Sequence, residues 1–449
     1  MESVRESVAK VMPSVRADLE RMVRIPSVSA DPAAGQHMAA SAELVATLLR
    51  AAGLSDVEIL TVDGGQPAVV GRRPAPPGAP TVLLYAHHDV QPVGARSDWA
   101  SDPFAPEERE GRLFGRGASD DKAGIALHLA ALRALGDELP VGVVVLIEGE
   151  EEIGSPTLRQ FLTTYAQRLA ADVVILADST NWTVDVPALT TSLRGGNHVT
   201  VEVRTLDHAV HSGMYGGAVP DALTSLCRLL ATLHDVEGNV AVRGLVAGTS
   251  AAPELTEVQL RADAGVLDGV HLIGSGSLTD RLWSRPAVTV IGIDAPTVAD
   301  ASPTLLPAAR AAISLRVAPG DDVIRAQAAL IAHLESNAPW GARVTVTAKG
   351  TASPYTAATS GRAYDAAHWA FEQAWGTEAV DIGVGGSIPF IAAFAELLPD
   401  AEILITGVED PDTRAHGPNE SLHLGMFGRC CLAESLLLAR LGETGTAPA

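Results

Sequence analysis

Two histidines and an aspartate follow an apolar run that is typical of a buried strand. The segment "TVLLYAHHDVQP" places His87, His88 and Asp89 directly after residues 81–86. Because successive side chains of a strand point to opposite faces, we expect His87 and Asp89 to share one side and His88 to point away. If His87 binds a metal, Asp89 is placed to accept the other imidazole N–H and fix the ring.

Two acidic segments could supply further ligands. In "GRGASDDKAG", Asp120 and Asp121 precede a predicted helix, where either could simply cap the helix N-terminus. Like charges that lie this close together are costly unless a cation or solvent neutralises them. The segment "EGEEEIGS" follows another apolar run. The same cost applies to its four neighbouring glutamates, Glu148, Glu150, Glu151 and Glu152.

Two more candidates lie farther along the chain. Asp178 ends the apolar run "DVVILAD", and His416 lies in "RAHGPNE", after the apolar run "AEILITG". Two imidazoles with several carboxylates suit two Zn²⁺ or Mn²⁺ ions that share one carboxylate and one water, whereas Ca²⁺ prefers oxygen ligands alone.

The elements that must position these residues alternate between buried strand and helix. Strand patterns at 81–86, 141–147 and 172–177 alternate with helical patterns at 121–137 and 157–170. This alternation predicts an α/β sandwich with a mostly parallel central sheet. Polar residues follow each strand at its carboxyl end, which is where open α/β sheets bind ligands.

A different pattern begins after Asp178. A β-α-β-β-α-β order predicts a smaller α+β domain with an antiparallel sheet. Patterns of the first type then resume, so we expect an insertion. The expected boundaries are 1–189 and 353–449 for the catalytic domain and 190–352 for the inserted domain.

The composition of the chain limits its possible binding partners and its cellular compartment. The 449 residues carry a net charge of −22, which repels nucleic acid and anionic membrane surfaces. The N-terminus has no apolar leader, and no apolar run is long enough to span a membrane. Three cysteines without a pairing pattern suit a reducing compartment, so we expect a cytoplasmic protein with no nucleic-acid or membrane partner.

Six motifs in register carry a family resemblance over nearly the whole chain. They are "HHDVQP", "GRGASDDK", "EGEEEIGS", "ILADST", "HSGMYGG" and "AHGPNESL". Together they resemble the M20 metallopeptidase family, and most closely its carnosinase-like dipeptidase branch. The resemblance implies a catalytic domain of the zinc-peptidase type and an inserted domain that serves as a lid or a dimerisation domain.

The resemblance also assigns roles at a two-metal site. It implies that Asp89 orients a metal-bound histidine, that Glu151 is the general base, and that His211 of "HSG" stabilises the oxyanion. Zn²⁺ is the expected ion, with Mn²⁺ or Co²⁺ as alternatives. The implied metal ligands, among which Asp120 is shared by both ions, are His87, Asp120, Glu152, Asp178 and His416.

Three residues are implied in substrate binding. Arg316 of "SLRVAP" matches an arginine that binds a substrate carboxylate. Gly386 and Ser387 of "GVGGSIPF" match a segment that offers backbone N–H groups beside the metals. In related dimers the "HSG" histidine reaches the active site of the partner subunit, so the resemblance also implies a homodimer formed through the inserted domain.

The implied activity is hydrolysis of the amide bond of dipeptides or short peptides by a metal-bridged water, with Glu151 as base. An alternative within the family is an amidohydrolase that removes the acyl group from N-acyl amino acids. A third hypothesis is a non-catalytic binding protein with the same fold. The presence of Glu151 beside a complete ligand set argues against it, since a binding protein needs no base there.

Overall fold

The computed structural model describes residues 2–386 and 389–443, and these divide into two compact units. Unit 1 contains the chain up to Thr191, the segment Ala357–Ile382 and the described residues from Pro389 onward. Unit 2 contains Ser192–Thr356 and the segment that begins at Gly383.

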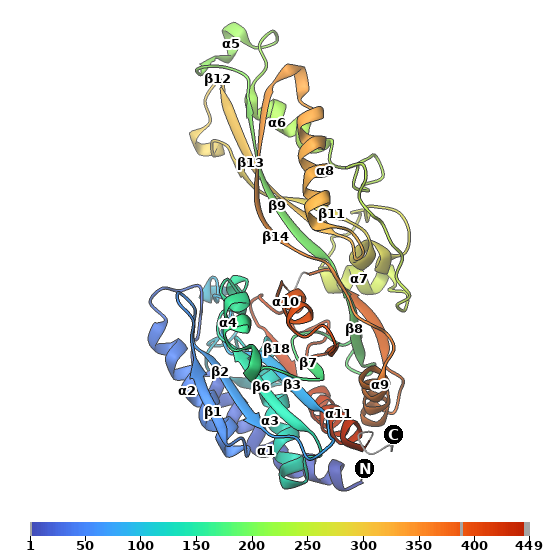
Figure 1. The fold of residues 1–449 in the computed structure, drawn as a ribbon. Helices are drawn as coiled ribbons and strands as arrows, with labels where there is room; N and C mark the ends of the chain where they lie inside the picture. Colours follow the sequence, from blue (N-terminus) through green and yellow to red (C-terminus); the bar gives the residue numbers. More distant parts are fainter. Residues whose placement is uncertain (1, 387–388, 444–449) are drawn as a thin grey trace. The chain divides into compact units, whose positions relative to one another are not determined.

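A six-stranded sheet forms the centre of unit 1, in the order β1-β2-β6-β3-β7-β17 (Figure 1). Strands β6, β3, β7 and β17 run parallel to one another, whereas β2 pairs antiparallel with both β1 and β6. The predicted fold class, with its mostly parallel central sheet, is therefore confirmed. The strands are β1 (Asp56–Leu60), β2 (Ala68–Arg73), β3 (Thr81–His87), β6 (Gly142–Glu148), β7 (Val173–Leu176) and β17 (Glu402–Ile405).

Helices cover both faces of this sheet, which explains why its central strands are buried along almost their whole length and are mostly apolar. On one face, Leu84 of β3 belongs to the same buried core as residues of α1, α3 and α11. On the other face, the ring of Tyr85 lies 4.3 Å from that of Phe390 and 5.6 Å from that of Phe394, both on α10. The helices of unit 1 are α1 (Glu2–Val23), α2 (Gly35–Ala51), α3 (Lys122–Leu135), α4 (Leu158–Thr164), α9 (Arg362–Trp375), α10 (Pro389–Leu397) and α11 (Leu424–Glu443).

A buried ion pair ties α3 and α11 to β3. Nδ1 of His128 lies 2.9 Å from the carboxylate of Glu434, and its Nε2 lies 3.0 Å from the carbonyl oxygen of Tyr85. Burial lowers the pKa of His128, but the Glu434 carboxylate outweighs it and raises that pKa overall. Both ring nitrogens therefore donate, and the imidazolium holds the backbone of β3 two residues before His87.

Two three-stranded sheets lie outside this central sheet. One contains β4 (Glu107–Arg109), β5 (Arg112–Phe114) and β18 (Ser421–His423), in the order β18-β5-β4. The other contains β15 (Tyr355–Thr356), β8 (Ala188–Leu193) and β16 (Val380–Val384), and it includes residues at which the chain passes from one unit to the other.

Unit 2 is built on a four-stranded antiparallel sheet in the order β11-β13-β9-β14, with α6 and α8 on one face. The valines of β9 alternate toward these helices, as a sheet that is covered on one side requires. This order of elements matches the predicted one, but α5, α7, β10 and β12 were not predicted. The elements are β9 (Gly195–Arg204), β10 (Val210–His211), α5 (Ser212–Tyr215), α6 (Ala222–Ala231), α7 (Glu257–Ala264), β11 (Ala287–Asp294), β12 (Thr304–Leu305), β13 (Ala308–Val317), α8 (Val323–Ser336) and β14 (Arg343–Ala352).

Among the helices in the described ranges, none combines the length and the apolar character that crossing a membrane requires.

Candidate metal centre

Six side chains of unit 1 form two groups of potential metal ligands. In each group, one ligand atom from each of the three residues lies within 4.8 Å of the other two. The first group is His87, Glu151 and Asp178. The second group is Asp120, Glu152 and His416.

Asp120 lies between the two groups. Its Oδ1 is 3.2 Å from Nε2 of His87, and its Oδ2 is 3.0 Å from Nε2 of His416. Nε2 of His87 is also 3.9 Å from Asp178 Oδ1, and Nε2 of His416 is 3.3 Å from Glu152 Oε2. One carboxylate therefore faces both imidazoles, which is the arrangement of a bridging ligand.

The parallel strands bring these residues together. His87 is the last residue of β3, Asp178 follows β7, and Glu151 and Glu152 follow β6. His416 lies in the loop after β17. Because β6, β3, β7 and β17 are parallel, all four carboxyl ends lie along one edge of the sheet.

Asp89 is buried beside the ring of His87. Its Oδ1 lies 3.3 Å from Nδ1 of His87, and its Oδ2 accepts the backbone N–H of Glu152 at 3.1 Å. His88 points elsewhere, since its Nε2 lies 2.8 Å from the carbonyl oxygen of Pro67. Asp89 thus holds one residue of each group.

The structure separates the two aspartates that precede α3. Asp121 accepts the backbone N–H of Gly124 at 3.1 Å as the N-cap of the helix, and it also accepts the backbone N–H of His87 at 3.2 Å. Asp120 faces the two histidines. The capping role and the role beside the metals therefore belong to different residues.

The four crowded glutamates also divide into two pairs. Glu148 accepts the hydroxyl hydrogen of Tyr85 at 2.7 Å, and burial raises its pKa to about 8. Glu150 accepts the backbone N–H and the hydroxyl of Thr157, each at 2.7 Å. Only Glu151 and Glu152 remain for the two ligand groups.

Gln91 is a residue that the sequence analysis did not assign. Its backbone N–H donates to Glu152 Oε1 at 3.0 Å, and its side-chain amide donates to Oε2 at 2.7 Å. Both carboxylate oxygens of this potential ligand are therefore fixed by one residue. Gln91 stands inside the motif "HHDVQP", but its partner lies 61 residues away, so only the motif itself could have signalled it.

The electrostatics of the centre show a shortage of positive charge. Burial raises the pKa of Glu152 to about 9 and that of Asp178 to about 6, and in each case the charge of Asp120 adds to the shift. Burial also raises the pKa of Glu151 well above its usual value, followed by the charge of Asp178. Asp120 differs, because the neighbouring imidazoles of His416 and His87 outweigh its burial and lower its pKa.

The residues fit a pair of divalent ions. Nε2 of His87 is buried and makes no hydrogen bond in the described part of the chain. Imidazole with carboxylate is a donor set that suits Zn²⁺, Mn²⁺ or Co²⁺, and two cations would neutralise the crowded carboxylates. His87 and Asp178 of the first group would hold one ion and the second group the other, with Asp120 placed to contact both.

The predicted residues of the inserted domain lie in unit 2. His211 ends β10 and is exposed, and its Nδ1 accepts the backbone N–H of Gly213 at 3.0 Å. Arg316 is half-buried on β13, opposite Gly196 of β9. Ser387 lies outside the described residues, whereas Gly386 is described.

Arg194 is a second residue that the sequence analysis missed. Its side chain donates to the carbonyl oxygen of Gly385 at 3.1 Å. A Cβ at position 385 would lie 2.5 Å from its guanidinium, so this approach requires glycine. Burial lowers the pKa of Arg194 to about 10, and the charge of Arg316 adds to the effect. The positive charge of Arg316 thus acts on Arg194, whose side chain contacts the segment that contains Gly386.

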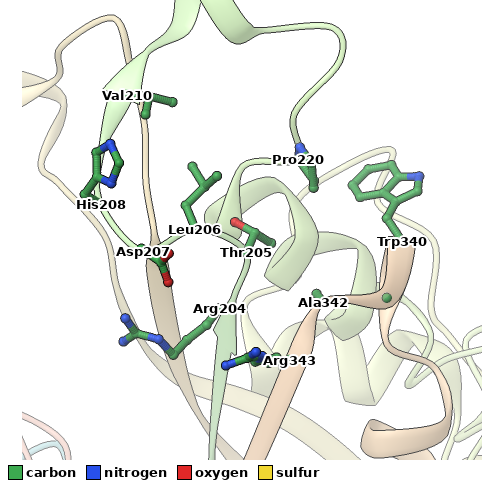
Figure 2. Close-up of a pocket in the computed structure, with 11 residues that line it drawn as sticks. Arg204, Thr205, Leu206, Asp207, His208, Val210, Pro220, Trp340, Ala342 and Arg343 are labelled. Atoms are coloured by element: carbon green, nitrogen blue, oxygen red, sulfur yellow. The ribbon is translucent and has the colours of Figure 1, made fainter.

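Unit 2 also contains a pocket with a volume of about 400 Å³. Figure 2 shows Pro220 and Trp340 on one side of it and Arg204, Asp207 and His208 on the other. None of the predicted site residues lines it.

Comparison with known proteins places these features in a family. The sequence model described as "Peptidase family M20/M25/M40" matches residues 83–438. A cysteinylglycine-S-conjugate dipeptidase of Corynebacterium striatum is 35% identical over 411 residues, which cover 90% of each chain. A human Beta-Ala-His dipeptidase is 27% identical over 380 residues, which cover 80% of this chain and 74% of the human protein.

Solved structures show the same fold. The crystal structure of human carnosine dipeptidase 1 superposes with a TM-score of 0.82 and 25% identity, and the match covers 98% of both chains. The dipeptidase Dug1p of Saccharomyces cerevisiae gives a TM-score of 0.83 at 23% identity, covering 100% of this chain and 99% of that one.

The crowded carboxylates predict how the stability of the metal-free protein depends on pH. The folded metal-free protein keeps Glu152 protonated up to about pH 9 and Asp178 up to about pH 6. The unfolded chain releases these protons near pH 4. Because the folded state binds more protons, its stability should fall as the pH rises from about 5 to 9.

The measurement is the melting temperature of chelator-treated protein across this pH range, with and without saturating Zn²⁺. Bound ions should make the melting temperature less dependent on pH, and so should Glu152→Gln in the metal-free protein. A melting temperature of the metal-free protein that stays constant or rises over this range would contradict the prediction.

Proposed function

The chain belongs to peptidase family M20/M25/M40 and is a metallohydrolase, and from this premise we propose that it is a two-metal dipeptidase. Its reaction would be the hydrolysis of the amide bond of dipeptides or short peptides. The observation that carries the proposal is the position of Asp120, which turns one oxygen toward each of two histidines that belong to separate ligand groups.

The proposed mechanism uses Glu151 as the general base. Two divalent ions, when bound, supply Lewis-acid chemistry that polarises the scissile carbonyl and lowers the pKa of water. The carboxylate of Glu151 lies within 4.8 Å of ligand atoms of His87 and Asp178, and its raised pKa suits a group that accepts and returns a proton. Glu151 would take a proton from the attacking water and pass it to the leaving amine.

Unit 2 would supply the groups that bind the substrate and stabilise the oxyanion. Because Nδ1 of His211 accepts a hydrogen bond, its proton lies on Nε2, which can donate to an oxyanion. Arg316, beside Arg194, would bind the free carboxylate of the substrate. Gly386 and Ser387 would offer backbone N–H groups.

The names of the relatives favour dipeptides over acylated amino acids as the substrates of this protein. The names of the Corynebacterium striatum and human relatives both describe dipeptidases, one for cysteinylglycine conjugates and one for Beta-Ala-His. An N-acyl-amino-acid amidohydrolase remains the alternative, because the same metal centre would serve both reactions. We propose Zn²⁺ as the native ion, with Mn²⁺ or Co²⁺ as alternatives, and a cytoplasmic location that suits three free cysteines.

We also propose a homodimer that forms through unit 2. Strand β11 is an edge of the four-stranded sheet, so its outer N–H and C=O groups have no strand beside them. Val290, Ile291 and Ile293 of this strand are 41%, 54% and 47% exposed. An apolar edge strand can pair antiparallel with the same strand of a second copy, because a two-fold axis makes that surface self-complementary.

The first test is a substrate panel with chelator-treated protein that is resupplied with Zn²⁺, Mn²⁺ or Co²⁺. Cys-Gly, an S-conjugate of Cys-Gly and β-Ala-His would each be compared with an N-acetyl form of the residue that hydrolysis releases. We expect amino-acid release from the free dipeptides only, and none before metal is restored. Cleavage of the acetylated compounds alone would support the amidohydrolase, and no cleavage with metal bound would support a binding protein.

The second test concerns the base. Glu151→Ala should retain both ions and lower kcat by about 10²- to 10⁴-fold, because a proton acceptor is lost while the ligands remain. Elemental analysis gives the metal content, and Glu152→Ala, which removes the neighbouring ligand, is the matched control that should lose an ion. If Glu151→Ala loses an ion instead, Glu151 is a ligand and not the base.

The third test concerns the dimer. Ile291→Lys should shift the protein from dimer to monomer, because a charge on the paired edge costs desolvation and repels its counterpart across the axis. Sedimentation velocity measures the change. Thr347→Lys on β14, the opposite edge of the same sheet, should leave the dimer intact. A dimer that survives the first substitution, or dissociates with the second, would contradict this interface.

A further inference from the structure

A buried carboxylate outside the two ligand groups accepts hydrogen bonds from the whole turn that carries Asp120. Glu420 is fully buried, and its Oε1 accepts the backbone N–H groups of Ser119 at 3.0 Å and Asp120 at 3.1 Å. Its Oε2 accepts the backbone N–H of Gly117 at 3.1 Å and a guanidinium N–H of Arg116 at 2.6 Å. Every partner is a donor, so both carboxylate oxygens act as acceptors.

Arg116, which pairs with Glu420, holds a second segment of the metal centre. Arg116 is 1% exposed, and its Nη2 donates to the carbonyl oxygens of His416 at 3.1 Å, Gly417 at 3.2 Å and Pro92 at 3.3 Å. The guanidinium therefore joins the loop after β17 and the segment after β3 to the turn that carries Asp120.

The contacts of this pair are unequally distributed between the two ligand groups. Asp120 binds Glu420 through its backbone N–H, and His416 binds Arg116 through its backbone carbonyl. Both residues belong to the second group. Within the described part of the chain, the hydrogen bonds of the pair reach no residue of the first group.

We propose that Arg116 and Glu420 are a positioning pair that sets the affinity of the protein for one of its two ions, the one held by Asp120, Glu152 and His416. This inference rests on the proposed two-metal function. Neither residue reaches the ion itself. The pair fixes the backbone from which two ligands project, and such supporting contacts typically change metal affinity by about 10- to 100-fold.

The chemistry of the pair explains why replacing either residue with a similar side chain should weaken metal binding. Glu420→Gln keeps the size of the side chain but turns an NH₂ group toward backbone N–H donors, so at least one of them loses its acceptor. Arg116→Lys keeps the charge, but one ammonium cannot reach Glu420 and three carbonyl oxygens in the way that a planar guanidinium does. Both substitutions should release the turn or the loop without removing a ligand.

The experiment titrates metal-free protein with Zn²⁺ by calorimetry and measures bound zinc by elemental analysis after dialysis. The unaltered protein should bind two ions. Glu420→Gln should bind the ion of the second group about 10- to 100-fold more weakly and the other ion with a smaller loss, because that ion shares only Asp120 with the second group. Arg116→Lys should show the same unequal loss, and it provides the test if Glu420→Gln does not fold.

A matched control separates positioning from stability. Asp410 is buried and pairs with Arg112 at 3.1 and 2.8 Å. Asp410→Asn therefore breaks a comparable pair that, among the described residues, makes no hydrogen bond to either ligand group. This control should lower the melting temperature and keep both zinc affinities.

Two outcomes would overturn the positioning role. One is a Glu420→Gln protein that binds both ions as tightly as the unaltered protein. The other is an equal weakening of both sites that Asp410→Asn reproduces, since that would show a general loss of stability. Two ions bound without hydrolysis of any dipeptide would contradict the proposed function and leave this inference standing.

Discussion

The repulsion among carboxylates at one edge of a sheet is the constraint on which the rest of this structure depends. Glu151, Glu152 and Asp178 are brought together with Asp120 around only two imidazoles, and burial, followed by this repulsion, raises the pKa values of the first three. A protein without cations here would gain stability by separating these groups. The two divalent ions that we propose would neutralise the cluster and use its geometry for hydrolysis.

The fold meets this constraint by holding the ligands through contacts with neighbouring residues outside the two ligand groups. The backbone carbonyl of Asp89 binds the ring of His87, Gln91 binds both oxygens of Glu152, and Glu420 binds the backbone of Asp120. These contacts are buried or partly buried hydrogen bonds between groups that cannot easily find other partners. The ligands are therefore held near one another before any ion arrives, which lowers the cost of binding it.

We propose different chemical tasks for the two units. The residues of the two ligand groups lie in unit 1, at the ends of parallel strands, in the loops that follow these strands and, for Asp120, in the turn before α3. The residues that we propose for substrate and oxyanion, His211 and Arg316, lie in unit 2. This division suits a family in which one metal centre serves several substrates, because changes in unit 2 leave the ligands intact.

The sequence alone determined the fold class and the set of candidate ligands, because strand periodicity and motif order are local properties of a chain. It could not choose between Asp120 and Asp121 from the residues themselves, nor foresee Gln91, Arg194 and the pair of Arg116 with Glu420. Those choices depend on contacts between segments far apart in the chain: Glu420 lies 304 residues from Arg116. Tertiary structure decided them, since a hydrogen bond depends on distance and direction in space, and the spacing of residues along the chain fixes neither.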